Sequence, residues 1–194
     1  GVNGAAVHRV WVANNYAYVC VWNLYGIGLQ VVDVGQPNSP QVVSSCNTRG
    51  AAFGIYVKGI YAYVAAERGL RVINVSNPTT PYEVGCYNTS DRAYDVCVAA
   101  GYAYVATERA GLRVMDVGEP SYPSEVGHYD TPGRAKAVYV GDNYAYVADG
   151  DSGIRIIDVS ELSNPHEIGH CDAPGASDVF VVDTLAYVAC GDFR

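Results

Sequence analysis

The stretch that decides the fold is Asn143 to Val159, which reads N-Y-A-Y-V-A-D-G-D-S-G-I-R-I-I-D-V. Two alternating apolar runs, 144–148 and 154–159, flank a short segment rich in glycine and aspartate. Alternation places successive side chains on opposite faces of a strand, and the segment between the runs has the composition of a tight turn. The stretch therefore predicts a β-hairpin.

The same hairpin recurs along the chain. The first strand of the hairpin, Tyr-Ala-Tyr-Val, begins at Tyr16, Tyr61, Tyr102 and Tyr144, and a Leu-Ala-Tyr-Val variant begins at Leu185. The second strand of the hairpin recurs as a Gly-Leu or Gly-Ile run at 28–34, 69–75, 111–117 and 153–159, and the copy that begins at Leu185 lacks it. A β-rich repeat of about 40–45 residues is the period of one four-stranded propeller blade. The sequence therefore predicts a β-propeller.

Two further strands complete each repeat. A short apolar run precedes the hairpin, at 7–12, 52–57, 93–98, 135–140 and 176–181. A link that contains proline follows the hairpin and leads to a Glu-Val-Gly run, or its variant, as strand four. Because proline cannot donate a hydrogen bond to a strand ladder, we expect these links to lie outside the pairing.

We therefore expect an all-β protein with four complete four-stranded blades and the inner two strands of a fifth. The repeats run over about 7–46, 52–87, 93–130 and 135–171, with a half repeat at 176–190, and form one domain over 1–194. Residues 190–194 fall where the preceding repeat opens its third strand. Either the chain stops within a blade, or these residues are a fragment of a longer chain whose missing strands close the ring.

Composition bears on the partners. The chain has 20 acidic and 12 basic residues, a net charge of −8, and no cluster of lysine and arginine in its sequence. We expect such a chain to bind neither nucleic acid nor an anionic membrane. No apolar run approaches the ~20 residues that span a bilayer, and no signal peptide is visible, so Gly1 is a mature N-terminus or the edge of a fragment.

The six cysteines form no C-x-x-C and have no zinc-ligand spacing. An even number scattered along a β-protein favours disulfides and an oxidising compartment over free buried thiols. The candidates are Cys20, Cys46, Cys86, Cys97, Cys171 and Cys190, and one specific pairing that we consider is Cys171 with Cys190, because both end strands that run toward the same rim.

Three motifs together resemble the LVIVD-repeat family. They are Asp130-Thr131-Pro132-Gly133 followed by an Ala-x-x-Val-x-Val strand, the Tyr-Ala-Tyr-Val-Ala run at 144–148, and Gly-Ile-Arg-Ile-Ile-Asp-Val-Ser at 153–160. The resemblance covers essentially the whole chain. It implies a β-propeller, usually in bacterial or archaeal secreted or cell-surface proteins, with no general catalytic residues.

Three groups of polar residues invite a chemical interpretation. Asp149-Gly150-Asp151-Ser152-Gly153 has the look of a calcium loop, but lacks a bidentate glutamate, so we interpret it as a hairpin turn. His166 and His170 lie about 13 Å apart along a strand, too far to share a metal, and His128 repeats the position of His170. Asp95 and Asp178 share one position on the first strand, where they could line a central channel as a cation or acid–base site. We expect no catalytic residue, metal or cofactor.

The link between strands two and three is longer in the first repeat and carries Trp22, Leu24 and Tyr25. Such an apolar insertion either caps the rim of the ring or forms a contact patch for a partner. At the other end of the chain, Leu185 and Tyr187 lie on a strand that we expect to be an unpaired apolar edge, which recruits strands from other chains.

These features favour an extracellular structural or adhesive propeller that assembles head-to-tail with copies of itself, as a ring or a filament. A surface or matrix partner is also expected. The alternative is a fragment of a larger propeller that binds a ligand or protein at one rim. A metal-dependent hydrolase is the least favoured hypothesis.

Overall fold

The computed structural model describes residues 6–22 and 28–191 and contains only strands and turns in them. The strands form four sheets of four antiparallel strands and one sheet of two. Each sheet follows chain order, so that successive strands are hydrogen-bonded neighbours. The predicted propeller with four complete blades and two strands of a fifth is thus confirmed. No helix in the described part of the chain is long and apolar enough to cross a membrane.

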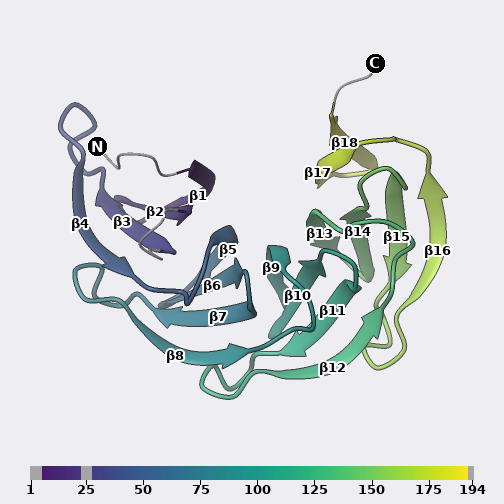
Figure 1. Cartoon of the computed structure of the whole chain (residues 1–194), viewed down its shortest axis with the longest axis horizontal. Coiled ribbons are helices and arrows are strands. Elements are labelled where there is room, and N and C mark those ends of the chain that lie inside the picture. The colour runs from purple at the N-terminus through teal and green to yellow at the C-terminus, as the bar shows by residue number, and fades with distance from the viewer. Residues whose placement is uncertain (1–5, 23–27, 192–194) are drawn as a thin grey trace. The chain divides into compact units, whose positions relative to one another are not determined.

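The chain divides into two compact units. The first comprises residues 1–93 with 120–122, and the second comprises 94–119 with 123–194. The first unit holds two blades: β1 (Ala6–Ala13), β2 (Tyr16–Trp22), β3 (Leu29–Asp33) and β4 (Gln41–Cys46), followed by β5 (Ala52–Lys58), β6 (Tyr61–Ala66), β7 (Gly69–Asn74) and β8 (Tyr82–Tyr87). Strands β1 and β2 pack against β5 (Figure 1).

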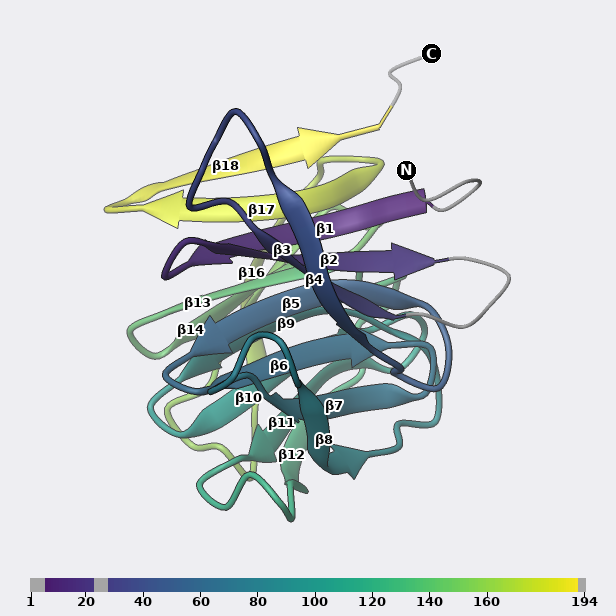
Figure 2. The same cartoon turned by 90° about the vertical axis from the view of Figure 1, so that its left-hand side faces the viewer.

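The second unit holds the remaining sheets. They are β9 (Ala93–Ala99), β10 (Tyr102–Thr107), β11 (Gly111–Asp116) and β12 (Ser124–Tyr129), then β13 (Ala137–Gly141), β14 (Tyr144–Ala148), β15 (Ile154–Asp158) and β16 (His166–Cys171), and finally β17 (Ala176–Val182) and β18 (Leu185–Cys190). Strand β10 packs against β13, and both β13 and β14 pack against β17. Figure 2 shows β17 and β18 along their length, in yellow.

The local sequence explains why these strands form. The central strands of a blade pack against a neighbouring blade of the same unit and are largely apolar. The leucine or isoleucine that opens the third strand is buried in every copy, at Leu29, Leu70, Leu112 and Ile154. The predicted proline-containing links between the third and fourth strands lie outside the pairing in all four complete blades.

The cores lie between successive blades of each unit. In the first unit, Leu29 and Val31 pack with Ile55 and Val64 of the next blade. In the second unit, Leu112 and Val114 pack with Val138 and Val147. A smaller cluster joins the β13–β16 blade to Ala176 and Val179 on one face of β17. A blade is therefore stable only when a neighbour covers it, as in other repeat proteins.

Candidate functional site

The first candidate site is the two-stranded sheet β17–β18. Among the described residues, β18 pairs only with β17, so its outer edge keeps unpaired backbone groups. Leu185 and Tyr187, the two residues predicted on this edge, have 61% and 59% of their surface exposed. Phe180 on β17 is exposed to the same degree, although its ring touches that of Tyr139 edge-on at 5.3 Å. The sheet is thus covered on one face and open on the other face and on its outer edge.

The fourth strands of the first three blades share a contact at one equivalent position, where the proline link of the next blade lies against the strand. In the first blade, the Ser44 hydroxyl donates a hydrogen bond to the carbonyl of Pro78, in the proline link that follows. In the second and third blades, Gly85 and Gly127 occupy the same position, and the links at Pro120 and Leu162 lie directly against them. A side chain at either glycine would overlap a backbone oxygen. The outer strand of one blade therefore supports the proline link of the next.

Gly169 occupies this position in the β13–β16 blade, but the described residues place no link over it. A Cβ atom added there would meet only the Cδ1 atom of Ile156, at an ordinary 3.9 Å. The sequence keeps the small residue that a following link requires, while β17 and β18 supply only the first two strands of the next blade. Gly169 is therefore an open position of the described structure, in contrast to Gly85 and Gly127.

The remaining predicted contact residues belong to the first unit. Trp22 ends β2 and has 54% of its surface exposed. Leu24 and Tyr25 lie outside the described residues, in the segment 23–27. Trp22 thus offers an exposed aromatic surface at one end of the first blade.

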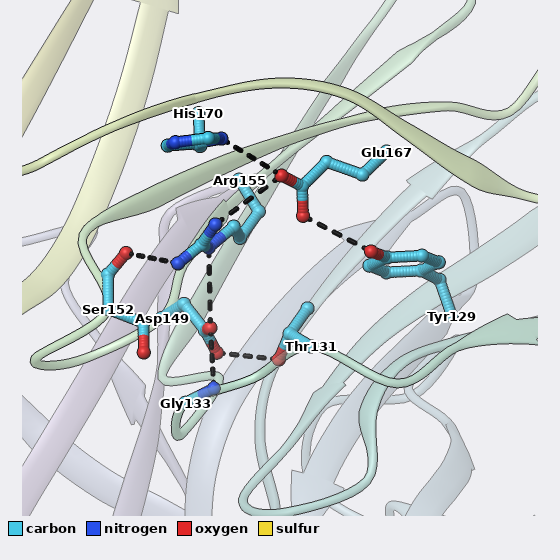
Figure 3. A network of polar contacts seen from close by, with 8 residues as sticks. All are labelled: Tyr129, Thr131, Gly133, Asp149, Ser152, Arg155, Glu167 and His170. Atoms are coloured by element: carbon cyan, nitrogen blue, oxygen red, sulfur yellow. Dashed lines mark hydrogen bonds and ion pairs between the residues drawn. The ribbon is translucent and has the colours of Figure 1, made fainter.

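A network of polar contacts around Arg155 forms the second candidate site (Figure 3). Arg155 on β15 lies between two carboxylates: its Nη1 atom is 3.3 Å from Oε1 of Glu167, and its Nε atom is 3.8 Å from Oδ2 of Asp149. Its Nη2 atom donates to the carbonyl of Ser152 at 2.9 Å. The hydroxyl of Tyr129, from the preceding blade, donates to Oε2 of Glu167 at 3.2 Å. The network therefore ties two blades of the second unit together.

Asp149 is the buried end of this network. Its side chain is fully buried, and it accepts hydrogen bonds from Thr131 Oγ1 at 2.6 Å and from the Gly133 amide at 2.8 Å, both in the link between blades. Burial raises the pKa of the Asp149 carboxyl, against the opposing effect of these two donors and of Arg155. Burial also raises the pKa of the Tyr129 hydroxyl, and the neighbouring Glu167 adds to the effect. The carboxylates are held by protein donors, which is the arrangement of a structural network.

Arginines equivalent to Arg155 in the second and third blades make different contacts. Arg113 on β11 contacts Oε1 of Glu125 at 3.4 Å and Oδ1 of Asp130 at 2.8 Å. Arg71 on β7 is only 1% exposed, and its Nη2 atom donates to Asn88 and to the Arg68 carbonyl. The Nε and Nη1 atoms of Arg71 have no hydrogen-bond acceptor within the described structure. Sequence reasoning missed these arginines, although Gly-Leu/Ile-Arg recurs in three of the strands quoted for the repeat.

The motif that resembles a calcium loop is a hairpin turn between β14 and β15. Asp149 points away from the loop, toward Thr131 and Gly133, whereas Asp151 is exposed. No group of three or more potential metal ligands occurs in the part of the chain that the structure describes.

The two aspartates predicted to line a channel have different roles. Asp95 is buried on β9, and its Oδ2 atom accepts a hydrogen bond from the Val138 amide of the next blade at 3.2 Å. Asp178 accepts a bond from the amide of Val179, the residue that follows it. Asp95 therefore joins two blades, whereas this hydrogen bond of Asp178 is local to β17.

His128, His166 and His170 lie at the surface on fourth strands. His128 and His170 place Nδ1 3.1 Å from Oε1 of Glu125 and of Glu167, respectively. His166 approaches the carbonyl of Asn164 at 3.4 Å. Each of these three histidines thus contacts groups of its own blade.

The cysteine prediction requires a correction. All six residues, Cys20, Cys46, Cys86, Cys97, Cys171 and Cys190, are free thiols in the structure. The considered pair is not formed: the Cys171 thiol lies 4.0 Å from the carbonyl of Asp172, and the Cys190 thiol lies 3.9 Å from that of Ala173. A disulfide requires two side chains that point at each other, and a shared rim does not provide this geometry.

Comparison with known proteins agrees with this architecture and defines its class. The LVIVD repeat matches residues 4–48, 49–89, 91–131 and 132–173, one copy for each complete blade. The chain belongs to the LVIVD repeat family, as its motifs predicted. None of the curated proteins compared with this chain matches it.

The solved structures that share the fold include two computationally designed proteins. One is the computationally designed Ika8 protein, with a TM-score of 0.73 and 11% identity over 95% of this chain and 55% of the design. The other is the computationally designed Ika4 protein, with a TM-score of 0.64 and 10% identity over 79% of this chain and 91% of the design. The chain thus spans about half the length of the Ika8 protein.

Proposed function

We propose that this chain is a non-catalytic, extracellular structural propeller that assembles with copies of itself through the β17–β18 sheet. The observation that carries the proposal is the uncovered position at Gly169 beside an unpaired apolar edge. In the first three blades, the fourth strand supports the proline link of the next blade. The fourth strand β16 is followed in the described chain only by β17 and β18, so no link covers Gly169.

The β18 edge has the chemistry of a strand acceptor. Unpaired backbone groups on an edge bind an added strand, and alternate side chains set its register. Natural edges that avoid such pairing carry charges or proline. The sequence of β18, Leu-Ala-Tyr-Val-Ala-Cys, has neither.

The first blade carries a different apolar surface that fits a head-to-tail contact. Trp11 packs against Tyr56 of the next blade with ring centroids 4.6 Å apart, whereas Val10 and Val12 of the same strand are exposed. Two different surfaces that meet give a heterologous contact, which closes into rings or extends into filaments. Trp22, with its neighbours Leu24 and Tyr25 in the sequence, extends the proposed contact surface of the first unit.

A second candidate is a binding scaffold within a longer polypeptide, in which later residues of the same chain supply the missing strands. The two-stranded sheet β17–β18, which corresponds to the first two strands of a blade, favours this alternative. In that case β18 is an internal strand, and a ligand or protein partner binds at one rim of the ring.

Sedimentation of this chain over a range of concentrations, with variants of the edge, tests the first proposal. We expect the wild type to form oligomers or filaments, and Tyr187→Lys to remain monomeric, because a charge on the strand opposes pairing. Tyr122→Lys is the matched control, since Tyr122 is even more exposed but lies in a link. It should assemble like the wild type.

A wild type that remains monomeric at about 100 μM, roughly a hundredfold above a micromolar affinity, would overturn self-assembly. The intact mass of the natural material separates the two candidates. A mass near 20.7 kDa in a larger particle supports assembly of copies, and a heavier chain in a single particle supports the longer propeller.

A further inference from the structure

Half of the chain's basic residues gather in two grooves at equivalent places in the repeat. The chain has 12 lysines and arginines. Three of them, Arg49, Arg68 and Arg92, line a groove of about 560 Å³ in the first unit. Another three, Arg109, Arg134 and Lys136, line a groove of about 440 Å³ in the second unit. In a chain with a net charge of −8, this distribution is unexpected for a simple solvated surface.

The two grooves share two parts of the repeat, although Arg49 in the first and Gly150 to Ser152 in the second come from other parts. The turn between the second and third strands supplies a Glu-Arg pair, at Glu67-Arg68 and at Glu108-Arg109. The link to the next blade supplies an arginine that approaches this glutamate: Arg92 lies 3.9 Å from Glu67, and Arg134 lies 3.9 Å from Glu108. The glutamate orients the arginine, while more than half of the Arg134 side chain remains exposed.

Both grooves have an excess of positive charge. The lining of the second groove contains three cations and one carboxylate, that of Asp151, and Glu108 pairs with Arg134 beside it. The first groove contains three cations and two carboxylates, and Arg49 is further held 3.1 Å from Glu83. Nearby cations within a concave surface reinforce one another's potential and attract anions.

The remaining lining of the second groove permits close approach. Gly133 and Gly150 contribute backbone without side chains, and Ser152 contributes a hydroxyl. A Cβ atom at Gly133 would lie 2.7 Å from Ser152 Oγ and 2.8 Å from Asp149 Oδ2, so the link must carry glycine there to close over the Arg155 network. The Arg155 network thus holds in place the backbone at Gly133, next to the basic side chains of the groove.

We propose that this groove, lined by Arg109, Arg134 and Lys136, binds the oxyanion group of a small molecule, such as a phosphate, sulfate or carboxylate. Arginine donates paired N–H groups to such planar or tetrahedral oxyanions, and lysine adds a point charge. A volume of about 440 Å³ is within the range of small-molecule sites.

Titration of the whole chain with inorganic phosphate, inorganic sulfate and citrate at low ionic strength tests the proposal. The readouts are calorimetry and the amide NMR signals of Gly133, Gly150 and Ser152. We expect at least one of the three anions to bind with shifts at these amides, and the double variant Arg109→Gln/Lys136→Gln to bind it at least about tenfold more weakly. A preference for phosphate and sulfate over citrate identifies an ester group as the natural ligand's anion, and the reverse identifies a carboxylate.

Lys58→Gln is the control for a distant charge: it removes one positive charge, where the double variant removes two, from an exposed residue at the other end of a blade. Its affinity should stay within about twofold of the wild type, as expected when only nearby charges act at this salt concentration. The proposal is overturned if none of the three anions binds, if the amide shifts appear elsewhere, or if Lys58→Gln weakens binding as much as the double variant.

Discussion

Gly127 and Gly169 occupy the same position in successive blades, and their replacement by alanine should have opposite effects. At Gly127 the link of the next blade lies directly against the backbone. A Cβ atom there would overlap the carbonyl oxygen of Leu162 and lie 3.0 Å from its carbonyl carbon and 3.2 Å from Cδ of Pro165. At Gly169 the only neighbour within 4 Å is Cδ1 of Ile156, at 3.9 Å.

The magnitude follows from these contacts. Ordinary carbon contacts lie at about 3.5–4.0 Å, so the Leu162 link must move by roughly 1 Å or more to admit the methyl group. Overpacking of this kind costs about 1–3 kcal/mol, and the upper part of the range applies because the obstacle is backbone. Loss of glycine's freedom in the unfolded chain returns about 0.4–1 kcal/mol. We expect a net loss of about 2 kcal/mol for Gly127→Ala and a gain of about 0.5 kcal/mol for Gly169→Ala.

Thermal and urea unfolding at high dilution measure both changes. For a chain of this size about 1 kcal/mol corresponds to roughly 2–4 °C in Tm, so Gly127→Ala should melt about 4–8 °C below the wild type and Gly169→Ala slightly above it. Equal Tm values for Gly127→Ala and the wild type would refute the packing argument, as would a comparable loss for Gly169→Ala under the same conditions.

Two further predictions concern the buried polar groups. Arg71→Met should be neutral or stabilising, because Arg71 is buried and two of its nitrogens lack acceptors. Arg155→Met should lower the free energy of unfolding by about 3 kcal/mol, because it leaves Asp149 and Glu167 without their cation. Equal losses for the two variants in urea unfolding would contradict this. The raised pKa of Asp149 means that the folded protein holds this proton to a higher pH than the unfolded chain does. The stability contributed by the protonated Asp149 is therefore complete below the ordinary pKa of about 3.8 and is lost as the pH rises through the pKa of the folded protein. The wild type should gain stability relative to Asp149→Asn as the pH is lowered. A loss of stability relative to Asp149→Asn on acidification, measured by urea unfolding, would contradict this prediction.

The sequence predicted the strands well because their information is local. The alternation in Tyr-Ala-Tyr-Val and the proline-framed links are read within a few residues, and both are correct in every complete blade. The buried polar network was missed because its members are distant in sequence. Asp149 meets Thr131 across a link between blades, and Arg155 meets Glu167 across a strand pair. The disulfide prediction failed for the same reason, since pairing depends on geometry that cysteine spacing does not contain.

A comparison of Gly169 with Gly85 and Gly127 distinguishes a residue that assembly needs from residues that folding needs. Within the described chain, Gly85 and Gly127 are needed because the next link lies against them, whereas nothing in the same chain explains a small residue at Gly169. If a link from a second copy covers Gly169, alanine there should leave the isolated chain fully folded and abolish its association. A purely repetitive origin of this glycine predicts the other result, in which Gly169→Ala assembles as the wild type does. Sedimentation of this one variant therefore decides whether the position is a remnant of the repeat or part of the proposed joint.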